Sequence, residues 1–299
     1  MDNKAEVREF LTSRRARLTP EMVGLPGGSN RRVPGLRRSE VATLAGVSIE
    51  YYAKLERGQI GGASESVLQA LAHALQLDDA EREHLTDLAR AAGAVSTRTR
   101  RTRGNPAVRS GMQLMLDAIT GGAGIVRNGR LDILAANALG RAMQSEAFES
   151  PGDGNLARYT FLDPRARDFH PNWEKAADIT VGILRTEAGR DPYDRGLQDL
   201  VGELSTRSTE FRTRWGAHNV RQHGAGVKQF IHPVVGALEL SYEDMQFVQH
   251  PGLTFLIYVP RPGSESEERF RILASWQATH EAATATVARD DAGAATRKD

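Results

Sequence analysis

The sequence of 299 residues contains no cysteine and no long apolar run. Without cysteine the chain can form no disulfide framework and no zinc site built on thiolates. No apolar segment approaches the roughly 20 residues that span a bilayer, and residues 1–4 do not resemble the start of a signal peptide. We therefore expect a cytoplasmic protein that has no membrane partner.

The common enzyme motifs are also missing. There is no Gly-x-Ser-x-Gly elbow, no Gly-x-x-x-x-Gly-Lys loop and no dinucleotide fingerprint. His218, His223 and His232 are separated by five and nine residues, and these spacings fit no common helical pair of metal ligands. The sequence therefore predicts no catalytic residues, no cofactor and no metal site.

The net charge of +1 is small, but its distribution is uneven. Residues 1–103 hold 17 Lys and Arg against 13 Asp and Glu, whereas the remainder holds 22 against 25. The N-terminal third is thus the part suited to a polyanion, although a solvated basic surface would give a similar count. The length allows two domains, each with its own core.

Residues 37–58 are the most specific stretch of the chain. Ser39 is expected to cap a first helix, Gly46 to form a tight turn, and Ser48 to cap a second helix that ends at Gly58. This order is typical of a helix-turn-helix, in which the second helix enters the major groove of DNA. The alternative is an ordinary α-hairpin with a glycine turn.

Charge placement favours the DNA-binding interpretation. Arg37 and Arg38 stand at the start of the first helix, where they would meet phosphates. Lys54 and Arg57 fall on the outward side of the second helix, whereas Tyr52 is expected in the core. A purely structural hairpin has no need of this arrangement.

Further helices are predicted on both sides of this stretch. Apolar residues at helical spacing indicate helices over residues 7–18, 64–75 and 79–92. Together with the helix-turn-helix they predict an all-α, five-helix bundle over residues 1–92. Residues 93–106 contain four arginines and almost no apolar side chain, so we interpret them as a basic linker or a plain spacer.

The loop over residues 19–36 is long for a helical bundle. It carries Arg31 and Arg32. We predict that one of them touches the phosphate backbone or reaches a minor groove. A solvated loop is the open alternative.

The motif Ser-Glu-Val-Ala-x-Leu-Ala-Gly-Val-Ser, followed by Tyr-Tyr-x-Lys-Leu-Glu-Arg-Gly, resembles the xenobiotic-response-element and phage-repressor class of helix-turn-helix regulators. The preceding Arg-Arg-Val-Pro-Gly-Leu-Arg-Arg makes the chain similar to the MmyB-like transcription regulators. This resemblance implies a C-terminal PAS-like ligand-binding domain, a fatty-acid-like effector and a homodimer on double-stranded operator DNA. It also implies base contacts from Ser48, Ile49, Glu50, Tyr51 and Lys54, and phosphate contacts from Arg37, Arg38 and Arg57.

The second half predicts an α+β domain with an antiparallel sheet over residues 107–278. Asn-Gly at 128–129 lies between apolar segments and signals a hairpin. We predict a helix over residues 137–143, an extended segment over 156–163, three helices between residues 173 and 218, and strands over 227–232, 234–242 and 253–259. A last helix ends at residues 270–276, and residues 279–299 are expected to be a disordered tail.

One predicted helix in this half combines rings with polar groups. At about 100° per residue, one face collects Phe211, Arg212, Trp215, His218 and Asn219. Arg212 could pair with a carboxylate and His218 or Asn219 could donate to it. The face therefore indicates a site for an apolar acid, unless Phe211 and Trp215 are ordinary core and Arg212 is a surface residue. A C-terminal half that serves only as a ligand-free dimerisation or protein-interaction module also stays open.

Overall fold

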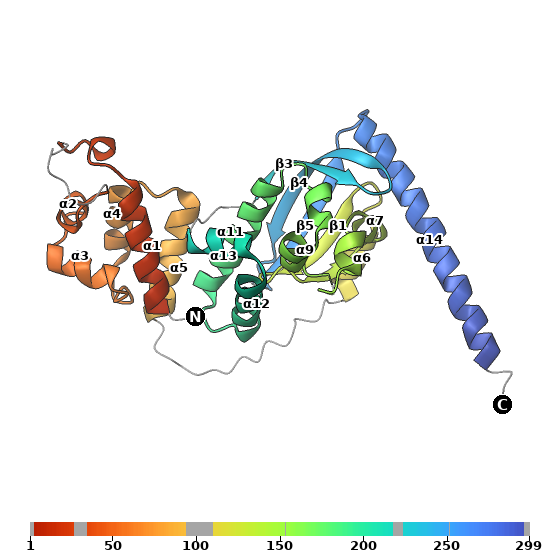
Figure 1. The fold of residues 1–299 in the computed structure, drawn as a ribbon, viewed down its shortest axis with the longest axis horizontal. Coiled ribbons are helices and arrows are strands. Elements are labelled where there is room, and N and C mark those ends of the chain that lie inside the picture. Colours follow the sequence, from red (N-terminus) through yellow and green to blue (C-terminus); the bar gives the residue numbers. More distant parts are fainter. Residues whose placement is uncertain are drawn as a thin grey trace. The chain divides into compact units, whose positions relative to one another are not determined.

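The computed structural model describes residues 3–26, 35–93, 110–152, 154–217, 224–250 and 252–295. The chain forms two compact units (Figure 1). Unit 1 combines Met1–Thr102 with Ala177–His223, and unit 2 combines Arg103–Ala176 with Gly224–Asp299. Unit 1 thus also contains the helices between residues 177 and 223, which lie within the predicted domain over residues 107–278.

Unit 1 is built of helices around an apolar core. Its N-terminal part contains α1 (Asn3–Arg17), the 3-10 helix η1 (Glu21–Val23), α2 (Arg38–Leu44), α3 (Ile49–Glu56), α4 (Glu65–Ala74) and α5 (Asp79–Gly93). It also contains most of α11 (Trp173–Arg190), with α12 (Arg195–Arg207) and α13 (Thr209–Gly216). Its fully buried side chains include Val7, Phe10, Leu11, Tyr52, Leu55 and Leu71. The predicted five-helix bundle is confirmed, and η1 is an addition within the predicted loop.

Unit 2 contains a five-stranded antiparallel sheet. The strands are β1 (Ala123–Asn128), β2 (Ile133–Ala136), β3 (Ala225–His232), β4 (Gly236–Gln246) and β5 (Leu253–Pro260), in the order β2-β1-β5-β4-β3. Its helices are α6 (Ser110–Asp117), α7 (Ala138–Met143), α8 (Ser145–Glu149), α9 (Leu156–Leu162), α10 (Arg165–Phe169) and α14 (Glu265–Ala295). The predicted α+β class with an antiparallel sheet is confirmed.

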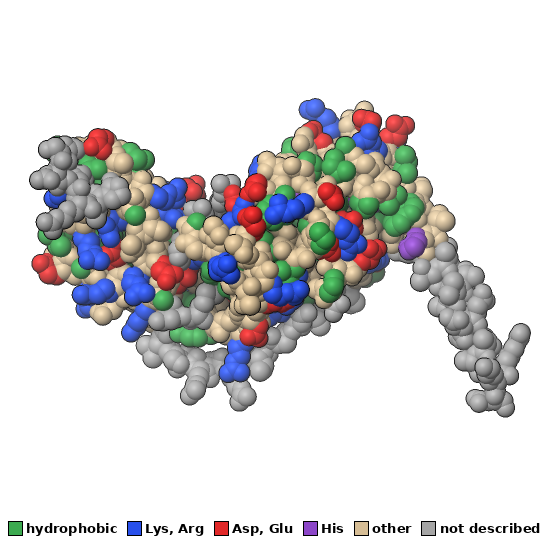
Figure 2. Space-filling view, viewed as in Figure 1, with side chains coloured by type: hydrophobic (Ala, Val, Ile, Leu, Met, Phe, Trp, Pro, Cys, Tyr) green, Lys and Arg blue, Asp and Glu red, His purple; other side chains and the backbone are tan. Residues whose placement is uncertain are grey.

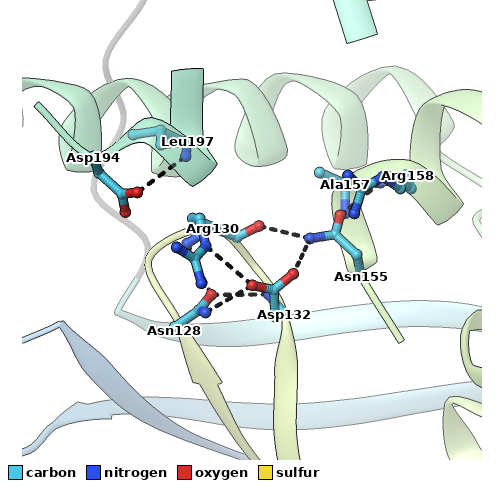
Figure 3. Close-up of polar contacts among 8 residues, drawn as sticks. All are labelled: Asn128, Arg130, Asp132, Asn155, Ala157, Arg158, Asp194 and Leu197. Atoms are coloured by element: carbon cyan, nitrogen blue, oxygen red, sulfur yellow. Dashed lines mark hydrogen bonds and ion pairs between the residues drawn. The ribbon is translucent and has the colours of Figure 1, made fainter. Parts of the chain in front are cut away.

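Residues 129–132 connect β1 to β2 in the predicted hairpin. Asn128 accepts backbone N–H bonds from Arg130 and Asp132, both at 3.0 Å, and Leu131 takes a positive φ of 66°. Asp132 in turn accepts from the Nδ2 atoms of Asn128 and Asn155 at 2.8 and 2.6 Å (Figure 3). The predicted hairpin is therefore confirmed, and side-chain hydrogen bonds fix its end.

The predicted extended segment over residues 156–163 is wrong, because these residues form α9. Asn155 caps this helix, since its Oδ1 accepts from the backbone N–H groups of Ala157 and Arg158 at 3.1 and 2.9 Å (Figure 3). An asparagine before an apolar run is a helix start signal. The apolar run that follows Asn155 is short enough to fit a strand as well as a helix, and the strand interpretation was the wrong one.

The predicted end of the last helix is also wrong. The helix α14 begins at Glu265 and continues to Ala295, past the point at residue 279 where we expect a disordered tail. Alanine recurs throughout the added turns, and alanine has the highest helix propensity of any residue. None of the described helices is long and apolar enough to cross a membrane.

Candidate functional site

The turn between α2 and α3 directs the second helix outward. Gly46 has a φ of +64°, and the N–H of Val47 donates to the carbonyl of Ala42 at 3.0 Å. The Oγ of Ser48 accepts from the N–H of Tyr51 at 3.1 Å and so caps α3 as predicted. Both ends of the turn are therefore fixed by local bonds.

The helix α2 starts one residue earlier than its predicted cap. Arg37 is the N-cap residue, and its N–H donates to the Glu40 carboxylate at 2.6 Å. Ser39 lies inside the first turn, where its carbonyl accepts from Thr43 Oγ1 at 2.9 Å. The prediction that Ser39 caps this helix is therefore wrong, because Glu40 satisfies the Arg37 N–H and allows α2 to begin before Ser39.

The outer face of α3 is polar and accessible. Glu50, Lys54 and Arg57 are exposed, and Ile49 is 48% exposed. Tyr51 is half-buried against the core. Buried on the inner face are Tyr52 and Leu55, both 0% exposed. Figure 2 shows several Lys and Arg side chains over the N-terminal helices. The helix thus presents its charged residues to solvent and anchors itself by its apolar ones.

Arg38 has a structural contact in addition to its predicted role. Its side chain is 56% exposed, and its Nε donates to the buried carboxylate of Glu56. The Nε of Arg15 also donates to this carboxylate, at 2.7 Å. Glu56 therefore ties α2 and α1 to the end of α3. Arg31 and Arg32 lie outside the described residues.

The predicted acid-binding face on α13 is divided. Phe211 is 0% exposed and stacks on Trp215, with ring centroids 5.5 Å apart. Arg212 is exposed and donates to the Ser205 carbonyl and to Thr209 Oγ1 at 3.2 and 3.3 Å. The structure thus brings the two rings together without Arg212. His218 and Asn219 lie outside the described residues.

The cation that packs against Trp215 is a buried arginine, Arg185, and not Arg212. The guanidinium carbon of Arg185 lies 4.2 Å from the Trp215 ring centroid, and its Nη2 donates to the Trp215 carbonyl. Its Nη1 donates to the carboxylate of Glu6 on α1. The side chains of Arg185 and Glu6 are 0% and 8% exposed, and burial raises the pKa of Glu6. This pair holds α1 against α11 and α13 within unit 1.

One face of the sheet in unit 2 gathers ionisable residues from four strands. Directly paired strand residues share a face, as do alternate residues along a strand. Tyr242 pairs with Tyr258, and the same face carries Lys228, Asp244 and Arg127. Arg127 Nη2 donates to Asp244 Oδ2 at 2.5 Å, and both side chains are at most 5% exposed. None of these residues is among the sites predicted from the sequence.

The ammonium group of Lys228 lies over aromatic rings. Its Nζ is 4.5 Å from the ring centroid of Tyr242 and 5.7 Å from that of Tyr258. Burial, with Arg127 nearby, lowers the pKa of Lys228 to about 7. Burial likewise lowers the pKa of His170 to about 3, so this imidazole is neutral at pH 7. The face therefore combines Lys228, whose pKa is near neutrality, with aromatic rings and the buried Arg127–Asp244 ion pair.

A period-two signal could have found this cluster. In β4, Leu238, Leu240 and Tyr242 are buried, and Asp244 follows in the same phase. In β3, Lys228 precedes the buried residues Phe230 and His232 in the same way. A charged residue in phase with the core is uncommon, and it marks a paired or functional group.

His232 is engaged in hydrogen bonds rather than left open for a metal. Its Nε2 lies 3.1 Å from the Ala142 carbonyl, and its Nδ1 accepts from the N–H of Val234 at 3.2 Å. Among the described residues, no group of three His, Cys, Asp or Glu is placed to hold a metal ion. His218 and His223 lie outside these residues.

Two family descriptions match this chain. The MmyB-like transcription regulator ligand binding domain matches residues 108–273, and a helix-turn-helix domain matches residues 6–85. A comparison with curated proteins finds no match. The first match alone covers more than half of the chain, and the second coincides with the capped, outward-facing helix α3. The chain therefore belongs to the MmyB-like transcription regulators, in which a helix-turn-helix DNA-binding domain is joined to a ligand-binding domain.

Proposed function

We propose that this regulator binds operator DNA as a homodimer and that an apolar acid of the fatty-acid class changes its affinity for DNA. The observation that carries the DNA-binding part is the geometry of α3, which is capped by Ser48, anchored by Tyr52 and Leu55, and exposed along Glu50 and Lys54. In a helix-turn-helix this is the helix that reads base edges. The matched domains give no support for an enzyme.

Roles on DNA follow from side-chain chemistry. Lys54 can donate to guanine acceptors, Glu50 can accept from cytosine N4, and Tyr51 can contact a thymine methyl or a phosphate. We assign further contacts near the start of α3 to Ser48 and Ile49, and phosphate contacts to Arg37, Arg38, Arg57, Arg31 and Arg32. A homodimer would place two such helices about one DNA turn apart.

The effector acts only if it binds one arrangement of the protein more tightly than the other. An acid with equal affinity for the DNA-binding and non-binding arrangements would shift neither population. The ligand-binding domain match supports a small-molecule effector. The acid class is supported by a cation near aromatic rings in this half, Lys228.

The DNA assignment is tested with the full chain and a duplex selected by it from a random library. Lys54→Ala or Glu50→Ala should change which bases are preferred, whereas Arg37→Ala should weaken binding to selected and random duplexes alike. Arg82→Ala is the matched control, because its side chain is 54% exposed on α5. Unchanged affinity for both duplexes in all three test variants would contradict the assignment.

A second candidate function is a ligand-free dimerisation module. The opposite sheet face exposes apolar side chains on β3 and β4, with Val227 at 56%, Met245 at 47% and Ile231 at 44%. Such a patch suits a second copy of the chain. Val227→Lys with Ile231→Lys would then abolish the dimer in light scattering, and no acid would alter DNA affinity in the parent chain.

A further inference from the structure

We propose that Glu56 is a positioning residue for DNA binding: it holds Arg38 by Nε, so that the two Nη groups of this guanidinium bind one backbone phosphate as a fork. The inference rests on the proposed function, because it requires that α2 and α3 lie on DNA. It assigns a role in DNA binding to a carboxylate that does not reach the surface, since the Glu56 side chain is 1% exposed.

Glu56 is the last residue of α3, and its carboxylate is bound by groups from three helices. Its Oε2 accepts from Nε of Arg38, the first residue of α2. Its Oε1 accepts from Nε of Arg15 on α1 at 2.7 Å and from the hydroxyl of Tyr52 at 3.4 Å. Both carboxylate oxygens are therefore engaged, and the carboxylate is fixed relative to α1, α2 and α3.

The chain that leads into α2 is anchored to α1 as well. Arg15 Nη1 donates to the Leu36 carbonyl at 2.8 Å, and the N–H of Leu36 donates to the Arg15 carbonyl at 3.2 Å. Gly35 approaches α1 so closely that a Cβ at this residue would lie 2.6 Å from the Cα of Ala16. The start of α2, which carries Arg38, is thus held in place beside Glu56.

The Arg38 guanidinium is bound on one edge and exposed on the other. Its side chain is 56% exposed, and it makes no hydrogen bond except that to Glu56 with the residues that the structure describes. This contact uses Nε and leaves the N–H groups of Nη1 and Nη2 for another acceptor. Because a guanidinium is planar, fixing Nε also limits the direction in which the Nη groups point.

The charge balance around Glu56 favours a phosphate as that acceptor. One carboxylate faces two guanidinium groups, so the cluster keeps a positive charge. The Arg15 side chain is 15% exposed and that of Arg38 is 56% exposed, so the charge meets solvent mainly at Arg38. A phosphate accepts two parallel N–H bonds from such a fork, and the first helix of a helix-turn-helix crosses the DNA backbone.

Holding Arg38 before DNA arrives should strengthen binding. An untethered arginine loses rotational freedom when it binds a phosphate, and this loss weakens binding. Arg38 has already given up part of that freedom in the protein alone, because its Nε is bonded. Lysine carries all its donors on Nζ, so an Nζ that bonds the buried Glu56 carboxylate lies short of the phosphate.

The first test replaces arginine by lysine, which keeps the charge. The affinity of the full chain for the selected and random duplexes is measured over a salt series. Arg38→Lys should weaken binding to both by about five- to tenfold and lower the salt slope by about one. Arg82→Lys is the matched control and should bind as the parent does, because Arg82 is 54% exposed and also pairs with a carboxylate, that of Asp79.

The second test uses Glu56→Gln, for which positioning and net charge predict opposite signs. Removing a negative charge would strengthen DNA binding if charge alone decided affinity. We expect both duplexes to bind about five- to tenfold more weakly instead, because Arg38 is no longer held. In an Arg38→Ala background the same change should cause no further loss. A role of Glu56 in the fold alone would produce the loss in both backgrounds.

The outcomes separate this inference from the proposed function. Parent-like affinity of Arg38→Lys, tighter binding by Glu56→Gln, or a loss from Glu56→Gln that persists in the Arg38→Ala background each overturns the inference. The proposed function stands in those cases if Lys54→Ala still changes base preference. If neither Lys54→Ala nor Arg38→Ala changes affinity for either duplex, both fail. If Glu56→Gln does not fold, the exposed substitution Arg38→Lys decides.

Discussion

On α3, Glu50 and Lys54 extend into solvent, whereas on the sheet face of unit 2 Asp244 and Lys228 lie among aromatic rings. The same two residue types thus occupy opposite surroundings. In water an exposed charge costs little and acts on whatever approaches it, but a buried charge needs a partner and its pKa shifts. Substituting the exposed charges of α3 should therefore change binding without changing stability. Substituting the buried charges of unit 2 should change stability and binding together.

The largest effect is expected at the buried pair of Glu6 and Arg185. Arg185→Met would leave Glu6 buried without its main cation, at a cost of about 3–5 kcal/mol in the free energy of unfolding. Chemical denaturation of the full chain measures this loss. Adding Glu6→Gln should recover part of it. A loss of less than about 1 kcal/mol would show that the inside of unit 1 tolerates charge as the surface of α3 does.

Lys228 should give the stability of the protein a pH dependence. Its pKa is about 7 when folded and 10.5 ordinarily, so between these values the unfolded chain binds more protons and stability rises with pH. The slope approaches about 1.4 kcal/mol per pH unit for one full proton. Lys228→Met should abolish it, as measured by denaturation between pH 7.5 and 9.5. An identical slope in both proteins would mean that Lys228 is hydrated like Lys54.

The cap of α3 should affect both stability and binding. Ser48→Ala removes the acceptor for the Tyr51 N–H and should cost about 1 kcal/mol. Ser64→Ala is the matched control, because Ser64 caps α4 through the Val67 N–H. Both variants should lose similar stability in thermal denaturation, but Ser48→Ala alone should weaken DNA binding. Equal DNA affinity of the Ser48→Ala and Ser64→Ala variants would show that α3 does not contact DNA.

The smallest change in stability is expected for substitution of Lys54. Lys54→Ala should alter the free energy of unfolding by less than about 0.5 kcal/mol, since the side chain is exposed. Its affinity for the selected duplex should fall nonetheless. Fluorescence anisotropy across a salt series measures this change, and a phosphate contact would show as a slope reduced by about one. A large loss of stability would mean that Lys54 is part of the packing.

The difference between α3 and the sheet face of unit 2 also shows which features can be predicted from sequence. Gly46 and Ser48 act on neighbours within five residues, so the turn and the cap of α3 can be identified from residue type alone. The cluster of Arg127, Lys228 and Asp244 depends on which strands become neighbours, and residues 117 positions apart meet there. The helical face at Phe211 shows the same limit, because periodicity groups Arg212 with the rings and packing separates them.

The partner of Glu6 lies 179 residues further along the chain. During synthesis α1 therefore emerges long before the arginine that neutralises its inner carboxylate. A shortened protein that ended after α5 would keep the whole of α3 but would leave this acid without Arg185. The first helix of the helix-turn-helix domain is thus completed only when the second half of the molecule has been made, so its stability depends on a residue of the region that matches the ligand-binding domain.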